Sequence, residues 1–104
     1  MKYSDLRVWQ EAMDLVVEIY RLASPMQRAA VSVPSNIAEG HGRKSTSAYT
    51  NHLSIAFGSL MELETQIRIA LRLDYASEAD VTDILARTDR VGKMLGALEK
   101  SLNK

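Results

Sequence analysis

Apolar residues recur at every third or fourth position along almost the whole chain, and no stretch alternates apolar and polar residues as a strand would. This spacing predicts four helices, over residues of about 4–22, 25–40, 46–73 and 78–102. The connections between these helices are short, which favours antiparallel neighbours. The pattern therefore predicts an all-α fold, an antiparallel up-and-down four-helix bundle that forms a single domain over residues 1–104.

Each predicted helix carries one apolar stripe that we expect to face the core. The stripes of the first and second helices are Leu6, Trp9, Met13, Val16 and Tyr20, and Met26, Ala30, Val33 and Ile37. Those of the third and fourth are Tyr49, Leu53, Ala56, Leu60, Leu63, Ile67 and Ala70, and Val81, Ile84, Thr88, Val91, Leu95, Leu98 and Leu102. The first and third helices also carry apolar residues outside their stripes, among them Val8, Leu15, Val17, Ile55, Phe57, Ile69 and Leu73. They indicate either a wide core-facing stripe or a subunit interface, because exposed apolar patches commonly mark contacts.

The second helix contains a proline and ends close to two glycines. Proline lacks a backbone N–H and crowds the carbonyl four residues before it, so we expect this helix to be kinked at Pro34. Gly40 suits the left-handed conformation that often ends a helix. Ser4 and Ser77 are predicted to cap the first and fourth helices. The segment Ala23–Ser24–Pro25 is expected to form a short break before the second helix.

A polar pair, Asn36 and Glu39, follows the proline at a spacing of three, which makes the two side chains neighbours on one helix face. If that face is buried, the pair needs partners, and an arginine such as Arg28 or Arg43 is the natural one. If it is exposed, the pair is an ordinary solvated surface. We therefore treat Asn36, Glu39 and Gly40 as a structural polar signature.

The composition is that of an ordinary globular protein, with 46% hydrophobic and 25% charged residues. Cysteine is absent, so a disulfide framework and a thiolate metal site are excluded. The first residues carry charges where a signal peptide needs an apolar run, and a cytoplasmic location is expected. The 13 basic and 13 acidic residues balance, so attraction to nucleic acid must come from a local patch.

The residues offer little for catalysis. The chain has two histidines, His41 and His52, and together with Glu39 they match no established zinc spacing. No glycine-rich motif that cradles phosphates is present. The sequence therefore predicts no catalytic residue, no metal site, no cofactor and no enzymatic activity.

Two groups of basic residues are candidates for binding nucleic acid. Arg43 and Lys44 precede the third helix, where free backbone amides and two cations make a credible phosphate site. The alternative is a simple helix cap with a basic turn. The fourth helix carries Arg87, Arg90, Lys93, Lys100 and Lys104. That set can follow a phosphate backbone or can be a solvated helix face.

Several segments resemble a known family, and RAAVSVPSNIAEGHGR at residues 28–43 is the most specific of them. The others are LRVWQEAMDLVVEIYRL, LSIAFGSLMELETQIRIALRL and VGKMLGALEKSL. In this order they resemble the four-helix bundle proteins encoded in intervening sequences of bacterial 23S ribosomal RNA genes. That group includes the accessory variability proteins of diversity-generating retroelements.

The resemblance implies a helical bundle assembled as a ring of five subunits, without known enzymatic activity. For the retroelement branch it implies binding to nucleic acid and to a reverse transcriptase. By this analogy Arg43 and Lys44 are the positions expected to contact nucleic acid. Family members usually have a longer connection before the signature than the five residues Ala23 to Gln27 found here. Either the connection is short in this protein, or a loop is missing from this sequence.

Overall fold

A computed structural model of the chain describes residues 1–22 and 26–103 and contains four long helices. They are α1 (Arg7–Leu22), α2 (Gln27–His41), α3 (Thr46–Arg72) and α4 (Glu78–Leu102), preceded by the short 3₁₀ helix η1 (Tyr3–Asp5). No strand occurs among the described residues. The predicted all-α four-helix fold is confirmed, whereas the predicted break at Ala23–Ser24–Pro25 lies outside the described residues.

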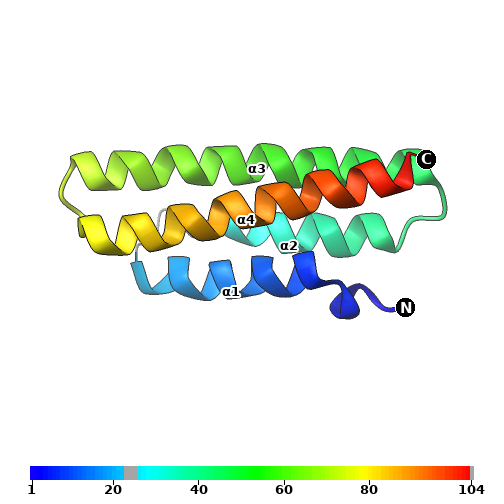
Figure 1. The fold of residues 1–104 in the computed structure, drawn as a ribbon, viewed down its shortest axis with the longest axis horizontal. Helices are drawn as coiled ribbons and strands as arrows, with labels where there is room; N and C mark the ends of the chain where they lie inside the picture. Colours follow the sequence, from blue (N-terminus) through cyan, green and yellow to red (C-terminus); the bar gives the residue numbers. More distant parts are fainter. Residues whose placement is uncertain (23–25, 104) are drawn as a thin grey trace.

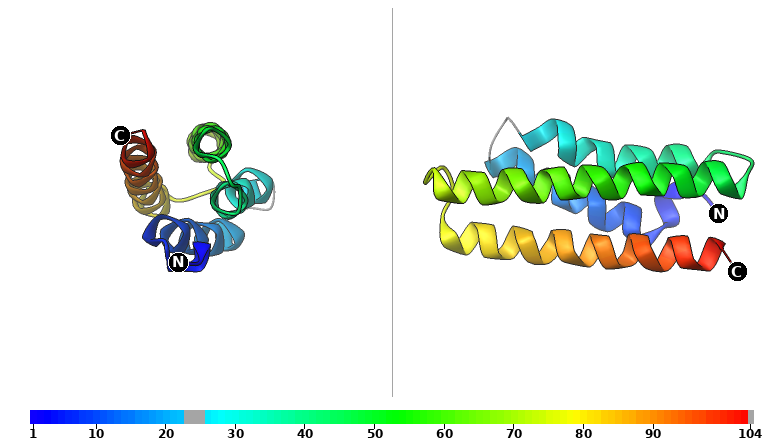
Figure 2. Two further views of the ribbon diagram at one scale, coloured as in Figure 1. Left: turned by 90° about the vertical axis from the view of Figure 1, so that its right-hand side faces the viewer. Right: turned by 90° about the horizontal axis from the view of Figure 1, so that it is seen from above.

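Each helix runs opposite to the one before it, as Figure 1 shows, so the topology is up-and-down. Seen end-on in Figure 2, the four helices occupy the corners of a square in chain order. Accordingly α1 packs against α2 and α4, and α3 packs against the same two helices. The bundle measures 44 × 20 × 18 Å. Its length is set by α3, whose 27 residues span about 40 Å.

The predicted core stripes of α2, α3 and α4 are confirmed, except that Tyr49, Leu98 and Leu102 are only partly buried. The buried apolar residues of these helices are Ala29, Ala30, Val33, Ile37, Leu53, Ala56, Leu60, Leu63, Ile67, Ala70, Val81, Ile84, Val91 and Leu95. Thr88 is also buried, and its hydroxyl donates a hydrogen bond of 2.8 Å to the Leu85 carbonyl. Burying one Leu, Ile or Val side chain stabilises the fold by about 1.5–3 kcal/mol, so these stripes hold the bundle together.

The predicted core face of α1 is wrong by one position. The residues that α1 buries are Val8, Ala12, Leu15 and Ile19. On the predicted stripe, Trp9 and Val16 are only partly buried, whereas Met13 and Tyr20 are exposed, Tyr20 by 52%. Both sets of residues have helical spacing, and the set that is buried includes the small residue Ala12. The predicted stripe instead forms the flank of α1 beside α2.

The helix ends follow ordinary capping rules, with one exception. Ser45 caps α3 by accepting a hydrogen bond from the Ala48 amide, and the predicted cap Ser77 accepts one from the Asp80 amide. The predicted cap Ser4 is wrong, because residues 3–5 form η1 and α1 begins only at Arg7. The Ser4 carbonyl instead accepts a hydrogen bond from the Gln10 side chain.

Helix α2 is continuous through Pro34, which is buried. The kink predicted at this residue stays a prediction. The described helices include no span that is long and apolar enough to cross a membrane.

Candidate functional site at the seam between α2 and α3

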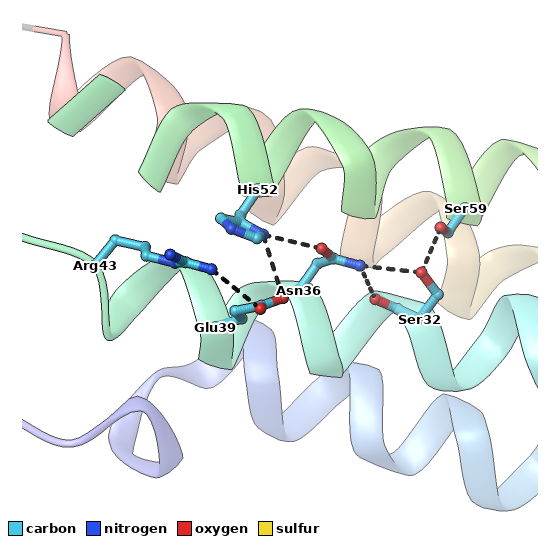
Figure 3. Close-up of polar contacts among 6 residues, drawn as sticks. All are labelled: Ser32, Asn36, Glu39, Arg43, His52 and Ser59. Carbon is cyan, nitrogen blue, oxygen red and sulfur yellow. Dashed lines mark hydrogen bonds and ion pairs between the residues drawn. The ribbon is translucent and has the colours of Figure 1, made fainter. Parts of the chain in front are cut away.

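A chain of polar contacts crosses the seam between α2 and α3 (Figure 3). The Ser59 and Ser32 hydroxyls lie 2.7 Å apart, and the Asn36 amide nitrogen donates to the Ser32 hydroxyl and carbonyl at 3.0 and 2.9 Å. The Asn36 oxygen lies 3.0 Å from Nδ1 of His52. Ser32 and Asn36 lie on successive turns of α2, and their partners His52 and Ser59 lie on α3, so the contacts tie α2 to α3.

The hydrogen bonds fix the protonation of one histidine nitrogen. Because Asn36 uses its amide hydrogens on Ser32, its oxygen is the acceptor toward His52. Nδ1 of His52 must therefore carry a proton and donate it. The His52 side chain is only 14% exposed, so this contact is largely shielded from water.

The outer end of the chain is ionic. Nδ1 of His52 also lies 3.6 Å from one oxygen of Glu39, and the other Glu39 oxygen accepts a hydrogen bond of 3.2 Å from Arg43. Of the two partners considered for this polar face, Arg43 is therefore the one that binds Glu39. Asn36 is half-buried and hydrogen-bonded, as expected for a buried polar group, whereas Glu39 is exposed to solvent. Each of the two alternatives for the pair therefore holds for one of its residues.

Gly40 is required by close packing and not by a left-handed conformation. It lies inside α2, and no described glycine has a positive φ. A Cβ atom placed on Gly40 would lie 2.7 Å from Cβ of His52 and 3.1 Å from Cδ1 of Tyr49. Only glycine lets the two helices approach this closely, which corrects the prediction of a left-handed helix end. The α2 helix continues to His41, and Gly42 follows with φ −77°.

The other histidine has a separate environment. The ring of His41 packs edge-on against Tyr49, with the ring centres 5.8 Å apart. The Tyr49 hydroxyl is buried and has no hydrogen-bond partner among the described residues. Burial raises the pKa of the Tyr49 phenol, because its charged form would lose hydration. The residues that the structure describes contain no group of three or more His, Asp or Glu side chains placed to hold a metal ion.

Arg43 and Lys44 lie in the exposed turn between α2 and α3, immediately before the cap Ser45. Arg43 pairs with Glu39. Within residues 1–22 and 26–103, no carboxylate lies in ion-pair range of Lys44. This turn is therefore partly neutralised and keeps one exposed cation beside the start of α3.

Of the five α4 cations named from the sequence, Arg87, Arg90 and Lys93 have acidic neighbours, and Lys104 lies outside the described residues. Arg87 pairs with Asp83 at 3.3 Å and Lys93 with Asp89 at 3.1 Å. Arg90 reaches across to Glu11 of α1 at 3.6 Å. The basic face of α4 is thus interleaved with carboxylates, which reduces its attraction for a phosphate backbone. The structure does not bring this face together with Arg43 and Lys44.

The sequence interpretation missed Ser32, His52 and Ser59 as members of the polar chain. A usable signal was present, because His52 and Ser59 are seven residues apart and therefore share one face of α3. Ser32 and Asn36 are four apart on α2. Two polar stripes with helical spacing on neighbouring helices predict such a contact once the pairing of the helices is known.

Comparison with known proteins identifies the family. A family model described as 23S rRNA-intervening sequence protein matches residues 4–97, a range that includes the whole seam. No curated protein matches the chain significantly. Since the family match covers nearly all of the chain, the protein belongs to the 23S rRNA-intervening sequence protein family.

Proposed function

We propose that this protein is a non-catalytic interaction module that associates with further copies of itself and acts by holding other macromolecules. One observation carries the proposal, the exposure of large apolar side chains on two helices. Tyr20 on α1 is 52% exposed, Ile69 on α3 is 50% exposed, and Leu73, the residue that follows α3, is 54% exposed. Exposed large apolar side chains of this kind are typical of protein contacts.

The charge distribution supports association between copies. The net charge is zero, so copies do not repel one another over long range. The resemblance described above implies five copies, and a cytoplasmic homopentamer is part of this proposal. Other proteins are further candidates for the same surfaces, a reverse transcriptase among them if the chain belongs to the retroelement branch.

Sedimentation velocity across a wide range of protein concentration tests the proposal. We expect the wild-type protein to sediment as a defined multiple of the 11.6 kDa chain. A monomer at every concentration would contradict self-association. The ratio of the measured mass to the mass of one chain gives the number of subunits and distinguishes a pentamer from smaller assemblies.

Binding to structured RNA or DNA is the second candidate function, and the turn before α3 favours it. There Lys44 and Arg43 stand beside the first backbone amides of α3, which have no acceptor inside the helix. A ring of copies would repeat this cationic turn by symmetry. The cations Arg87, Arg90 and Lys93 are weaker candidates because each already has a carboxylate neighbour.

Fluorescence anisotropy with labelled structured RNA and a matched duplex DNA, across a salt series, tests this second function. Binding through phosphates should weaken steeply with added salt. We expect Arg43→Ala/Lys44→Ala to weaken binding and to reduce the salt dependence. The variant Arg87→Ala/Arg90→Ala/Lys93→Ala serves as the comparison and should have the smaller effect. No binding at low salt would contradict nucleic-acid binding, and the proposed role as a protein-interaction module would then stand alone.

A further inference from the structure

The flank of α1 beside α2 forms an apolar groove. It has a volume of about 290 Å³ and is lined by Tyr3 from η1, by Trp9, Met13 and Val16 from α1, and by Val31, Pro34, Ser35 and Ala38 from α2. At Val16 this space meets a second hollow of about 390 Å³, lined by Val17 and Tyr20. We call the two together the α1–α2 groove. Pro34 and Ala38 on the α2 side have short side chains, so a side chain from another molecule can enter the groove.

A separate apolar row lies on the outer side of α3. The residues Phe57, Met61, Thr65, Ile69 and Leu73 follow one another at intervals of four, and all are exposed. Residues at this spacing form a ridge that winds around a helix, and such ridges pack into grooves of other helices. Each step of four residues turns the ridge by about 40°, so its middle part, from Met61 to Ile69, is the part that can face a single partner. The Thr65 hydroxyl donates a hydrogen bond of 2.9 Å to the Met61 carbonyl, so its polar atom is satisfied within the ridge. We call this row the α3 ridge.

The two surfaces account for most of the exposed apolar side chains. Twelve large apolar residues are exposed in the part of the chain that the structure describes, and nine of them lie in the α1–α2 groove or on the α3 ridge. These nine are Tyr3, Met13, Val17, Tyr20, Val31, Phe57, Met61, Ile69 and Leu73. Most of the exposed large apolar side chains therefore lie in the groove or along the ridge.

The dimensions and charges of the two surfaces suit each other. The α1 wall from Trp9 to Tyr20 spans eleven residues, about 16 Å, and the ridge from Phe57 to Leu73 spans sixteen, about 24 Å. The ridge has no charged member, and neither wall of the groove carries a charge apart from Arg21 at its end. The middle of the ridge, from Met61 to Ile69, spans about 12 Å and can lie along the groove, and its own members bring no charge into it.

We propose that the α3 ridge of one copy docks into the α1–α2 groove of the next, so that copies associate head to tail. Within one chain the two surfaces cannot meet, because α3 packs against α2 and α4, whereas α1 lies diagonally opposite α3 in the bundle (Figure 2). A contact between two different surfaces repeats from copy to copy and produces a ring if the rotation closes. The inference rests on the self-association proposed above and specifies its surfaces.

Two variants, each with one added charge, and a mixture of these two variants test the inference. Met13→Glu places a carboxylate in the groove, and Ile69→Glu places one on the ridge; both positions are exposed in the single chain, so folding should be retained. Ala97→Glu, on the exposed face of α4, adds the same charge outside both surfaces and is the control. Circular dichroism and thermal unfolding verify the helical fold of every variant.

We expect each of the two variants alone to associate at least tenfold more weakly than the wild-type and the control, measured by sedimentation velocity. Mixing them should restore association, but only to a one-to-one pair. The Met13→Glu copy keeps an intact ridge, and the Ile69→Glu copy keeps an intact groove, so this ridge can dock into this groove. The other two surfaces of the pair both carry the added charge and cannot bind a further copy. Native mass spectrometry identifies this pair.

Other results would overturn the inference. If Ile69→Glu leaves the assembly intact while Met13→Glu dissolves it, the groove pairs with itself and the ridge is not its partner. If the mixture stays monomeric, the two surfaces do not contact each other. In both cases self-association of the wild-type would stand, whereas a monomeric wild-type would refute the proposed function and this inference together.

Discussion

Gly40 shows how a single residue sets the distance between two helices. With a Cβ contact of 2.7 Å to His52, the variant Gly40→Ala must push α2 and α3 apart or displace the Tyr49 ring. We expect its free energy of unfolding to fall by about 1–3 kcal/mol, the usual cost of overpacking. Urea denaturation measures it. The matched control is Gly96→Ala on α4, where no atom lies within 4 Å of the new Cβ.

That control should change stability in the opposite direction. Alanine is the better helix former by about 0.5–1 kcal/mol, so Gly96→Ala should raise the free energy of unfolding. Equal effects of the two substitutions would show that helix propensity, and not the contact with His52, decides the outcome at Gly40.

Asn36 is the central member of the polar seam. The variant Asn36→Ala removes the acceptor of the His52 Nδ1 proton and the donor to the Ser32 hydroxyl. Partly buried polar groups left unpaired cost about 1–3 kcal/mol, and we expect a loss of that size in urea denaturation. Asn51→Ala, at an exposed position on α3, is the control and should have little effect. A loss at both positions alike would mean that the seam does not stabilise the fold.

Tyr49 should make stability depend on pH at the alkaline end. Its pKa is raised by burial, so the folded state holds the phenol proton more tightly than the unfolded state. The resulting stability is fully present below the unfolded pKa of about 10 and is lost as pH rises through the folded value. We expect Tyr49→Phe to flatten this decline, measured by urea denaturation at several pH values. At neutral pH the same variant should be as stable as the wild-type or up to about 1 kcal/mol more stable, since it removes an unpaired buried hydroxyl.

At the scale of the elements, the turn between α3 and α4 holds the one described non-glycine residue with a positive φ, Asp74 at 58°. The amides of Asp74 and Tyr75 donate to the carbonyls of Leu71 and Ala70, which is the Schellman arrangement that usually has glycine at this position. We expect Asp74→Gly to raise the free energy of unfolding by about 0.5–1 kcal/mol. Thermal unfolding measures the change, and Asp74→Val, with a branched side chain in the same conformation, should lower it. A gain from valine would contradict the strained geometry.

Helix α1 shows where sequence patterns suffice and where they do not. Spacing predicted all four helices and three of the four core faces, because on α2, α3 and α4 one stripe is clearly more apolar than its neighbours. On α1 two stripes with the same spacing lie side by side. Spacing cannot choose between Trp9 with Met13 and the smaller Ala12 with Leu15, because the choice depends on the surface of α2. There the groove beside Pro34 and Ala38 leaves Trp9 at the rim.

The polar seam was predictable only in part for a related reason. The signature residues Asn36, Glu39 and Gly40 were recognised on α2, but their partners His52 and Ser59 lie on another helix. Their roles depend on the register between α2 and α3, which is set by the close approach at Gly40. The spacing of residues along one helix cannot predict how that helix is aligned with its neighbour.

At the scale of the whole molecule, the four seams of the bundle differ in chemistry. The α2–α3 seam carries the chain of hydrogen bonds through Asn36 and also the unpaired hydroxyl of Tyr49. The α1–α4 seam carries the Arg90–Glu11 ion pair. The α1–α2 groove and the α3 ridge are apolar and uncovered. A molecule with apolar surfaces exposed to water is most stable when those surfaces are covered.

Stability should therefore depend on protein concentration. Association through surfaces that exist only in the folded chain stabilises that state by mass action, so the wild-type Tm should rise with concentration, on the order of a few °C per tenfold. The Tm of Ile69→Glu should be nearly independent of concentration, because its ridge cannot dock, and the Tm of Ala97→Glu should follow the wild-type. Calorimetry at a series of concentrations measures the slopes. A flat wild-type slope would show that the exposed surfaces add no stability through self-association, and an equal slope for Ile69→Glu would place the stabilising contact elsewhere on the bundle.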